Sequence, residues 1–488
     1  MSSPSFLQTQ LFINNEYVDA KSSETIKVTN PATDEIVTDK VQVAGEADID
    51  AAVDAATKAF KEGPWKTFTG VQRADCMNKF AELVKANASE LARLETQAMG
   101  AAFMITNIIA TSVPDIFKYY AGWADKIAGE QYPPDDGQYK IVSYQPLGVC
   151  AGIGAWNASL MLFAWKVAPA VAAGNTFIFK TSEKSPLGAL AFGKLIKEAG
   201  FPPGVINIVS GDGKAGQLLA QHMRIAKISF TGSGATGRKV ADAANKSNMK
   251  RVTMELGGKS PALVFEDADI ENALTCCSQN FLLLTGQVCA AASRVYVHKP
   301  IAEKFIAGLK ERFEALGKSV GADPLAPTTY IGPLADKIQF DRVMGYIESG
   351  KKEATLLTGG TRVGEKGQFI APTIFKDPSD NAKIYKEEVF GPVGIVKTFE
   401  TEEEAIRMAN DTSYGLSSTL YTNSVARALR VSAAIEAGSV SVNTSHSPNK
   451  LTPFGGWKSS GYGRELGKAG LMNYVQEKTI HIAMNIGP

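Results

Sequence analysis

Cysteine and histidine are both scarce in this chain. Its 488 residues include four histidines and only five cysteines, which are Cys76, Cys150, Cys276, Cys277 and Cys289. An odd set of cysteines does not form a disulfide framework, and the lack of any Cys-x-x-Cys pair argues against a zinc site. We therefore expect a reducing compartment and no bound metal.

The chain also lacks a charge excess and a long apolar run. Its 51 basic and 50 acidic residues leave a net charge of +1, which argues against binding to nucleic acid or to a membrane surface. No apolar run approaches the ~18 residues of a membrane span, and the first ten residues do not resemble a secretory signal. We expect a cytoplasmic protein, with 44% apolar residues to build a large core.

Helices and strands alternate along most of the sequence. Residues 71–96 have the pattern of a helix, 139–154 that of a strand and 160–173 that of a helix, and Thr176–Phe179 is a short buried strand. Such alternation predicts βαβ units around a mostly parallel sheet. A second alternating series runs from 260 to about 460. The sequence therefore predicts an α/β fold with two doubly wound parallel-sheet domains.

Two segments depart from this alternation. Residues 123–147 are rich in Tyr, Pro, Asp and Gly and interrupt the first series, and Thr479–Met484 alternates like an edge strand. An unprotected edge strand pairs readily with another chain. We therefore expect a small β excursion whose terminal strand pairs across a subunit interface.

A glycine-rich turn at Gly232–Gly237 matches the GxGxxG pattern of dinucleotide-binding folds. It follows a predicted strand and opens a predicted helix, whose N-terminus favours a phosphate group. Glu255 ends the next predicted strand about 20 residues on, where this fingerprint places a ribose ligand. In a second interpretation Glu255 is a catalytic base, because the bend at Gly257–Gly258 lets a ligand approach the backbone. Both interpretations remain open at this point.

Cys289 lies in a second glycine turn, Thr285–Ala290. A thiolate can add to a carbonyl carbon, but an ordinary thiol needs a nearby base or a stabilising charge to reach that form. Because histidines are few, a carboxylate such as Glu255 is the better candidate for the base. We also expect a helix N-terminus at Cys289 to lower the pKa of its thiol. Taken alone, Cys289 could equally be a small buried apolar residue.

Several motifs occur together along the chain. They are Ala155-Trp156-Asn157, Lys180-Thr181-Ser182-Glu183, Phe230-Thr231-Gly232-Ser233, Glu255-Leu256-Gly257-Gly258-Lys259, Gly286-Gln287-Val288-Cys289, Glu387-Glu388-Val389-Phe390-Gly391-Pro392 and Pro453-Phe454-Gly455-Gly456. With these motifs the chain resembles the aldehyde dehydrogenase superfamily over essentially its whole length, and most of all its NAD-dependent, non-acylating branch. The resemblance implies oxidation of an aldehyde to its carboxylic acid through a thiohemiacetal and a thioester of the cysteine.

The resemblance also implies roles for individual residues. Cys289 is the nucleophile, Glu255 activates water, and Asn157 donates its amide to the oxyanion. The implied NAD contacts are Ile153, Trp156, Lys180, Glu183, Gly213, Gly232, Ser233, Leu256, Glu388 and Phe390, with Gln339 and Arg342 as further candidates. The implied units are an NAD-binding domain of residues 1–122 and 147–257, a catalytic domain of residues 258–460, and oligomerisation strands at 123–146 and 470–488 that would form a homodimer or homotetramer.

Glu183 bears on the choice of cofactor. A carboxylate at a ribose contact can accept both ribose hydroxyls but repels a 2′-phosphate, so we predict NAD rather than NADP.

The sequence departs from the family pattern beside Asn157. The family usually has Pro before the Trp-Asn pair and a bulky aromatic residue and Pro after it, but here Ala155 precedes the pair and Ala158-Ser159 follow it. Loss of the aromatic side chain predicts a wide pocket for bulky aldehydes, aromatic or branched. The expected walls of this pocket are Ala158, Leu162, Trp165 and Phe454.

Two other functions remain as alternatives. A CoA-acylating dehydrogenase would replace water by a thiol, and the presence of Glu255 argues against it. A non-catalytic structural homologue would not need Cys289, Asn157 and Glu255 together. Glu465 is expected either to relay protons to Glu255 or to stabilise its own turn.

Overall fold

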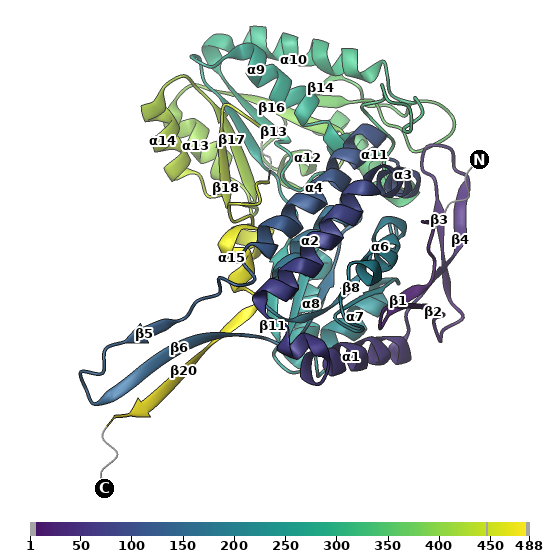
Figure 1. Cartoon of the computed structure of the whole chain (residues 1–488). Helices are drawn as coiled ribbons and strands as arrows, with labels where there is room; N and C mark the ends of the chain where they lie inside the picture. The colour runs from purple at the N-terminus through teal and green to yellow at the C-terminus, as the bar shows by residue number, and fades with distance from the viewer. Residues whose placement is uncertain (1–5, 446–447, 485–488) are drawn as a thin grey trace.

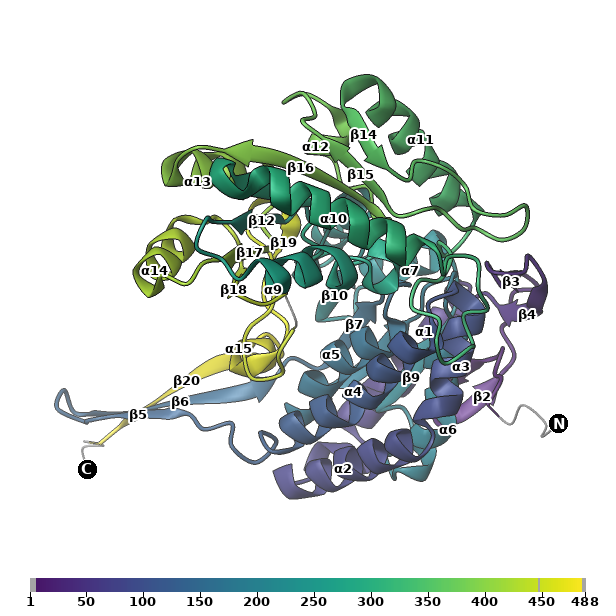
Figure 2. The same cartoon turned by 90° about the horizontal axis from the view of Figure 1, so that it is seen from above.

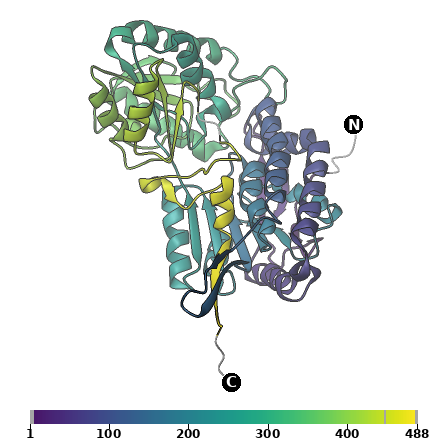
Figure 3. The same cartoon turned by 60° about the vertical axis from the view of Figure 1, so that its left-hand side comes forward.

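The computed structural model describes residues 6–445 and 448–484. Their strands form two large sheets, which lie in separate lobes (Figure 1, Figure 3). The predicted α/β class is confirmed, although the first sheet has antiparallel strands at both edges and the second has one at a single edge. No helix in the described part of the chain is long and apolar enough to cross a membrane.

The first sheet has its parallel strands in the centre and antiparallel strands at both edges. In sheet order the strands are β19 (Gly461–Tyr462), β11 (Arg251–Glu255), β10 (Lys227–Thr231), β7 (Val149–Ile153), β8 (Thr176–Lys180), β9 (Ile206–Val209), β1 (Leu11–Ile13) and β2 (Glu16–Val18). A separate pair, β3 (Thr25–Thr29) and β4 (Ile36–Gln42), flanks this lobe.

Helices cover both faces of the first sheet. One face packs against α2 (Gly70–Ala86), α3 (Ala88–Met99), α4 (Phe103–Ala121), α5 (Ser159–Ala172) and α6 (Leu187–Glu198). The other packs against α1 (Glu46–Lys61), α7 (Gly213–Gln221) and α8 (Gly234–Lys246). Alternation along β8 explains the two cores, because Phe177 and Phe179 belong to one and Ile178 to the other.

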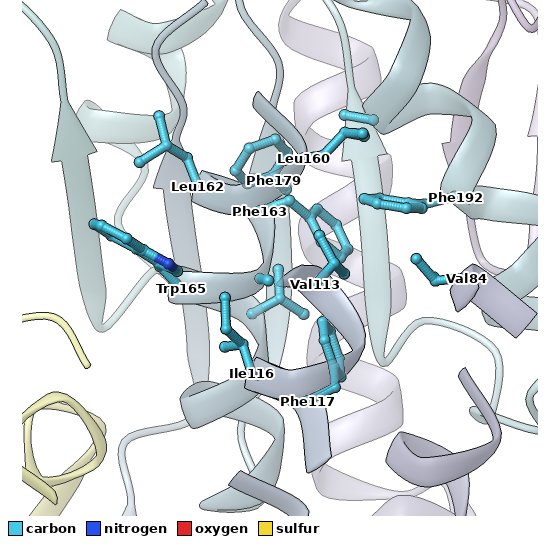
Figure 4. Packing of buried hydrophobic residues seen from close by; sticks show 14 of the residues in the cluster. Val84, Val113, Ile116, Phe117, Leu160, Leu162, Phe163, Trp165, Phe179 and Phe192 are labelled. Carbon is cyan, nitrogen blue, oxygen red and sulfur yellow. The ribbon is translucent and has the colours of Figure 1, made fainter. Parts of the chain in front are cut away.

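The centre of the larger core lies around Phe163 of α5 (Figure 4). Its ring is 5.1 Å from that of Phe179, 4.8 Å from that of Phe192 and 6.3 Å from that of Phe117. Close aromatic packing of this kind fixes α5 between α4 and the sheet. The segment that precedes α5, which carries Asn157, is thereby held at one end.

The second sheet is parallel apart from one edge strand. In sheet order it contains β14 (Thr355–Thr358), β15 (Thr373–Lys376), β16 (Val393–Phe399), β13 (Arg294–His298), β12 (Pro261–Val264), β17 (Ser417–Tyr421) and β18 (Ser439–Val442). One face packs against α9 (Ile270–Thr275) and α10 (Ala302–Gly317), and the other against α11 (Lys337–Glu353), α12 (Lys383–Lys386), α13 (Glu402–Asn410) and α14 (Val425–Ala434).

A third, smaller sheet projects from the body as an arm (Figure 1, Figure 2). Its strands are β20 (Val475–Ala483), β6 (Gln138–Pro146) and β5 (Glu130–Tyr132), and the short helix α15 (Gly467–Met472) leads into β20. β20 pairs with β6 along its whole length, and both β20 and β5 are edges of this sheet. The arm includes the predicted excursion, whereas the predicted domain boundaries stay predictions.

Two predicted elements differ from the structure. The helix predicted over 71–96 is interrupted at Asn87, whose side-chain amide donates to the carbonyl of Leu83 and so ends α2. The strand predicted over 139–154 is two strands in different sheets, β6 and β7. They are separated at Gly148, which has a φ of +119°, a conformation that glycine adopts without strain.

A fully buried arginine fixes the segment that joins the two large sheets. Arg294 begins β13, and its guanidinium donates to the carbonyl of Lys259 at 2.7 Å, to that of Ala409 at 2.8 Å and to the hydroxyl of Tyr296 at 3.0 Å. Lys259 lies between Glu255 and the first strand of the second sheet. Arg294 therefore connects this segment to α13.

We expect Arg294→Leu to lower the free energy of unfolding by about 3 kcal/mol or more, because each buried carbonyl left without a donor costs about 1–3 kcal/mol. Denaturant unfolding followed by tryptophan fluorescence measures this change. Arg407→Leu on α13 is the control. The Arg407 side chain is 71% exposed, and its ion pair with Glu404 is long, at 3.7 Å, so its loss should change stability little. Equal stability of the two variants would contradict the assignment.

Candidate active site

The loop that carries Cys289 has an unusual backbone. Leu284, Thr285 and Gly286 have φ values of 50°, 58° and 71°, and the first two are non-glycine residues in the left-handed region. Cys289 follows in a turn, so the expected helix N-terminus at this thiol is wrong. Burial instead raises the pKa of the Cys289 thiol to about 12, and the nearby carboxyls of Glu388 and Glu255 raise it further.

Gln287, a residue that the sequence did not mark as functional, fixes this loop. Its side chain is fully buried, accepts the N–H of Ala335 at 3.0 Å and donates to the carbonyl of Leu284 at 2.9 Å. Its own carbonyl accepts a hydrogen bond from Nδ2 of Asn157 at 3.0 Å. The amide of Asn157 and the thiol loop are thus directly connected.

Two glycines allow the backbone segments of the site to approach one another. A Cβ added to Gly258 would lie 2.3 Å from the carbonyl oxygen of Cys289, and one added to Gly286 would lie 2.2 Å from that of Gly391. No side chain fits at either distance. The segment after Glu255 therefore lies against the thiol loop, backbone to backbone.

Glu255 ends β11, as predicted, and only 5% of it is exposed. Its Oε2 has no hydrogen-bond partner among the described residues. Burial and the carboxyl of Glu465 raise the pKa of Glu255 well above its ordinary value, and the cations Lys166 and Arg464 oppose this shift. A buried carboxyl with a free oxygen and a raised pKa can exchange a proton with a ligand in the cavity beside it.

A buried ion pair lies behind Glu255. Lys166 contacts Oε1 of Glu465 and also donates to the hydroxyls of Thr231 at 2.7 Å and Ser229 at 3.1 Å. These partners compensate the charge and satisfy the hydrogen bonds of the buried Lys166 ammonium. Glu465 thus has a defined structural role, and its predicted role as a proton relay stays a prediction.

Cys289, Asn157 and Glu255 line one cavity of about 100 Å³, to which β11, the segment before α5 and the thiol loop each contribute. A larger cavity of about 670 Å³ lies beside it. Both are lined by Ala155, Trp156, Thr231, Gly232 and Ser233, so they adjoin.

The expected cofactor residues divide between these two cavities. Ile153, Lys180, Glu183 and Gly213 line only the larger one, Leu256, Glu388 and Phe390 line only the smaller one, and Trp156, Gly232 and Ser233 line both. Glu255 lines only the cavity that contains the thiol. This placement supports its interpretation as a base rather than as a ligand of the adenosine ribose.

The larger cavity fits a dinucleotide. Oε2 of Glu183 is 3.6 Å from Nζ of Lys180, so a carboxylate and a cation converge where ribose hydroxyls could bind. Burial lowers the pKa of Lys180, and the carboxyls of Glu183 and Asp212 oppose that shift. A Cβ added to Gly234, in the first turn of α8, would meet no atom within 4 Å, which leaves room for a pyrophosphate at this helix N-terminus.

The inner end of the cavities is bounded by Trp156 and Phe390. Their rings lie edge to face with centroids 5.3 Å apart, and Phe390 has a φ of 59°. Gln339 donates to the carbonyl of Phe390 at 2.7 Å, and Arg342 donates to that of Glu388 at 2.9 Å. Both residues, expected as ribose contacts, thus hold the loop backbone as well as lining the smaller cavity.

Glu388 is itself a buried carboxyl. Burial raises its pKa to about 7, although the N–H of Gly258, at 3.0 Å, and the charges of Arg342 and Lys259 oppose the shift. It faces Gly257, where a Cβ would clash with its carboxylate. The sequence missed Lys184, which lines the larger cavity; its ammonium lies 5.2 Å from the Trp156 ring and pairs with Asp336 at 2.7 Å.

The four residues expected to line the substrate pocket are all buried in one apolar cluster, against which Cys289 packs. The rings of Trp165 and Phe454 are 5.1 Å apart. Trp165 also lines a further cavity of about 230 Å³ with Ile116 and Met161. Ala158, Leu162 and Phe454 do not line that cavity or the two described above.

Residues 17–480 match the aldehyde dehydrogenase family. An aldehyde dehydrogenase of Davidiella tassiana is 46% identical over 478 residues, which cover 98% of this chain and 95% of that protein. Aldehyde dehydrogenase, cytosolic 1, of Mus musculus is 44% identical and covers 97% of this chain and 94% of its own length.

Solved structures show the same fold. The NAD⁺ complex of an aldehyde dehydrogenase from Bacillus cereus has a TM-score of 0.95 and 39% sequence identity, and the match covers 99% of this chain and 98% of that one. Sequence and structure therefore agree over nearly the full length. The chain belongs to the aldehyde dehydrogenase family.

Proposed function

We propose that this chain oxidises a bulky aldehyde to its carboxylic acid through a covalent thioester on Cys289. Its family makes it an NAD-dependent aldehyde dehydrogenase; the roles of single residues and the breadth of the substrate pocket are the proposal. The observation that carries it is the convergence on one cavity of about 100 Å³ of a thiol, an amide and a carboxyl whose Oε2 has no hydrogen-bond partner among the described residues.

Cys289 begins the reaction as the nucleophile. Its thiol proton passes to solvent water, the sulfur then bonds to the carbonyl carbon, and the carbonyl oxygen becomes the oxyanion of a thiohemiacetal. Nδ2 of Asn157 and the N–H of Cys289 are the donors proposed for this oxyanion, and one such donor is worth about 10²–10³ in rate. The carbon must then lose a hydride, which NAD, when bound, accepts. Collapse of the oxyanion to a carbonyl leaves a thioester on Cys289.

Glu255 completes the turnover. It takes a proton from water, the resulting hydroxide adds to the thioester, and the carbon–sulfur bond breaks to release the acid and a thiolate, which takes the proton back from Glu255. A carboxylate base of this kind contributes about 10²–10⁴ in rate. The raised pKa of Glu255 suits this work, because a stronger base removes the proton more readily.

The residues of the larger cavity are proposed to bind NAD. Lys180 and Glu183 would hold the adenosine ribose, the N-terminus of α8 at Gly232 and Ser233 the pyrophosphate, and Glu388 the nicotinamide ribose. The open space at Gly234 and the pairing of a cation with a carboxylate support this assignment.

The cavity of about 230 Å³ between α4 and α5 is proposed to accept the body of the aldehyde. Trp165, Met161 and Ile116 give it an apolar wall, and Trp165 belongs to the cluster on which Cys289 packs. Its other side is polar and includes Asp115 and Lys450, which form an ion pair at 3.3 Å. A cavity of about 230 Å³ suits an aromatic or branched group better than a methyl group.

The arm is proposed to form the subunit contact of a homodimer or homotetramer. Its β20 and β5 are sheet edges, and an edge strand is a ready template for pairing with another chain.

Glu255→Gln should lower kcat by about 10²–10⁴ and leave a stoichiometric burst of NADH, because the thioester would form but not hydrolyse. Stopped-flow absorbance measures the burst, and fluorescence titration measures NAD affinity, which should change less than threefold. Cys289→Ala is the control that should show no burst. A large loss of NAD affinity without a burst would instead favour the ribose interpretation of Glu255.

Glu183→Ser should reduce the preference for NAD over NADP by about tenfold or more, because it removes a charge that repels the 2′-phosphate. The ratio of kcat/KM for the two cofactors measures the preference. Glu198→Ser, at an exposed position on α6, serves as the charge-matched control. A wild-type enzyme that prefers NADP would refute the assignment outright.

Met161→Trp should fill the cavity beside Trp165 and lower kcat/KM for benzaldehyde and branched aldehydes about tenfold, while acetaldehyde changes less than twofold. Met104→Trp is the control, because Met104 lies on α4 at 38% exposure and outside the cavity. A wild-type enzyme that strongly prefers acetaldehyde would contradict the wide pocket.

A further inference from the structure

A buried chain of hydrogen bonds runs from Glu95 on α3 to the peptide that joins Trp156 and Asn157. Oγ of Ser159 is 2.8 Å from Oε2 of Glu95 and 3.1 Å from the carbonyl oxygen of Ser185. The hydroxyl of Ser185 donates to the carbonyl oxygen of Trp156 at 2.8 Å. The chain thus ends on the peptide unit whose N–H belongs to Asn157.

All three links are removed from solvent. Glu95 is 2% exposed, and Ser159 and Ser185 are fully buried. A Cβ on Gly188 would lie 2.4 Å from Oε1 of Glu95, so this carboxyl lies against the first turn of α6 as well as the first residue of α5. A carboxyl buried this deeply is costly unless hydrogen bonds compensate it, so these bonds contribute to a single arrangement of the two helix ends.

The protonation state of Glu95 determines which group donates each hydrogen bond in this series. Burial raises the pKa of Glu95 to about 8, against the opposing hydrogen bonds from Ser159 and Gly188. The neutral acid at pH 7 can donate to the hydroxyl of Ser159, which then donates to the carbonyl of Ser185. The hydroxyl of Ser185 remains available for Trp156. Each hydroxyl proton is used once, and both serines are satisfied.

We propose that Glu95 is a positioning residue for aldehyde oxidation, which acts through Ser159 and Ser185 to fix the Trp156–Asn157 peptide. This inference rests on the proposed function, in which the amide of Asn157 binds the oxyanion. The hydrogen bond to the Trp156 carbonyl restrains the peptide plane from which Asn157 extends. The bond from Nδ2 of Asn157 to the carbonyl of Gln287 restrains the other end. Together they set the direction of the amide before any substrate binds.

Ser185→Ala tests the link nearest the site. We expect kcat to fall about tenfold or more, because a small displacement of a donor aimed at the transition state costs much of its effect. The KM for the aldehyde and the Kd for NAD should stay within twofold, since both ligands bind without the oxyanion. Thr96→Val is the matched control. Thr96 is next to Glu95 on α3, and its buried hydroxyl is 2.8 Å from that of Thr106. No hydrogen bond of this pair reaches Trp156 among the described residues, so kcat should be unchanged.

Two substitutions of Glu95 separate its hydrogen bond from its bulk. Glu95→Gln keeps the shape and a donor for Ser159, so kcat should stay within about threefold of the wild type. Glu95→Leu removes the donor and should lower kcat as much as Ser185→Ala does. Full kcat in both Glu95→Leu and Ser185→Ala overturns the proposal.

A double-mutant cycle with Asn157 completes the test. If Ser185 acts through Asn157, then Ser185→Ala should cause no further fall in kcat when Asn157→Ala is already present. Independent falls that multiply would mean that the serine has only a structural role, and the positioning role would be wrong while the proposed function stands. Full kcat in Asn157→Ala alone would overturn the proposed function and this inference together.

Discussion

The contact between the Gly257–Gly258 bend and the loop of Cys289 determines the geometry of the whole site. The strand that carries Glu255 belongs to the first sheet, whereas the thiol loop leads into β13 of the second. Because a Cβ at Gly258 would lie 2.3 Å from the carbonyl oxygen of Cys289, only glycine allows the two segments to touch. This contact brings a base and a nucleophile from different sheets to one cavity, and it constrains the segment between the two lobes.

The electrostatics of the cavity follow from that contact. Burial and the carboxyls of Glu388 and Glu255 raise the pKa of the Cys289 thiol, and burial likewise raises the pKa of each of these carboxyls. Burial thus opposes the charged form of each group. A positively charged ring in the same cavity would favour the anions, and cofactor binding and thiol activation would then be coupled by charge.

Much of this fold could be predicted from the sequence, because periodicity and glycine positions depend on local residues. The alternation of apolar residues predicted the parallel sheets, and Glu255 ends its strand as expected. The expected helix at Cys289 was wrong because Leu284 and Thr285 adopt left-handed angles that a sequence pattern disfavours for such residues. The surrounding packing, including the hydrogen bonds of Gln287, holds them there.

The residues that the sequence missed act over long distances along the chain. Glu95 shares the buried face of α3 with Leu91 and Ala98, but its partner Ser159 lies 64 positions away in the sequence. Gln287 lies in one of the motifs, but its bond from the N–H of Ala335, 48 positions away, depends on where the chain returns. The hydrogen-bond partner of a buried polar side chain is a property of the assembled core, and no local pattern identifies it.

The departure from the family pattern after Asn157 has two physical consequences. Ala158 removes an aromatic side chain, and Ser159 replaces a proline as the first residue of α5. A proline at that helical position would fix its own φ but could donate no hydrogen bond. Serine does not fix φ in this way, but its hydroxyl hydrogen-bonds to the buried carboxyl of Glu95. The residue that replaces the proline thus adds a hydrogen bond that restrains the segment carrying Asn157.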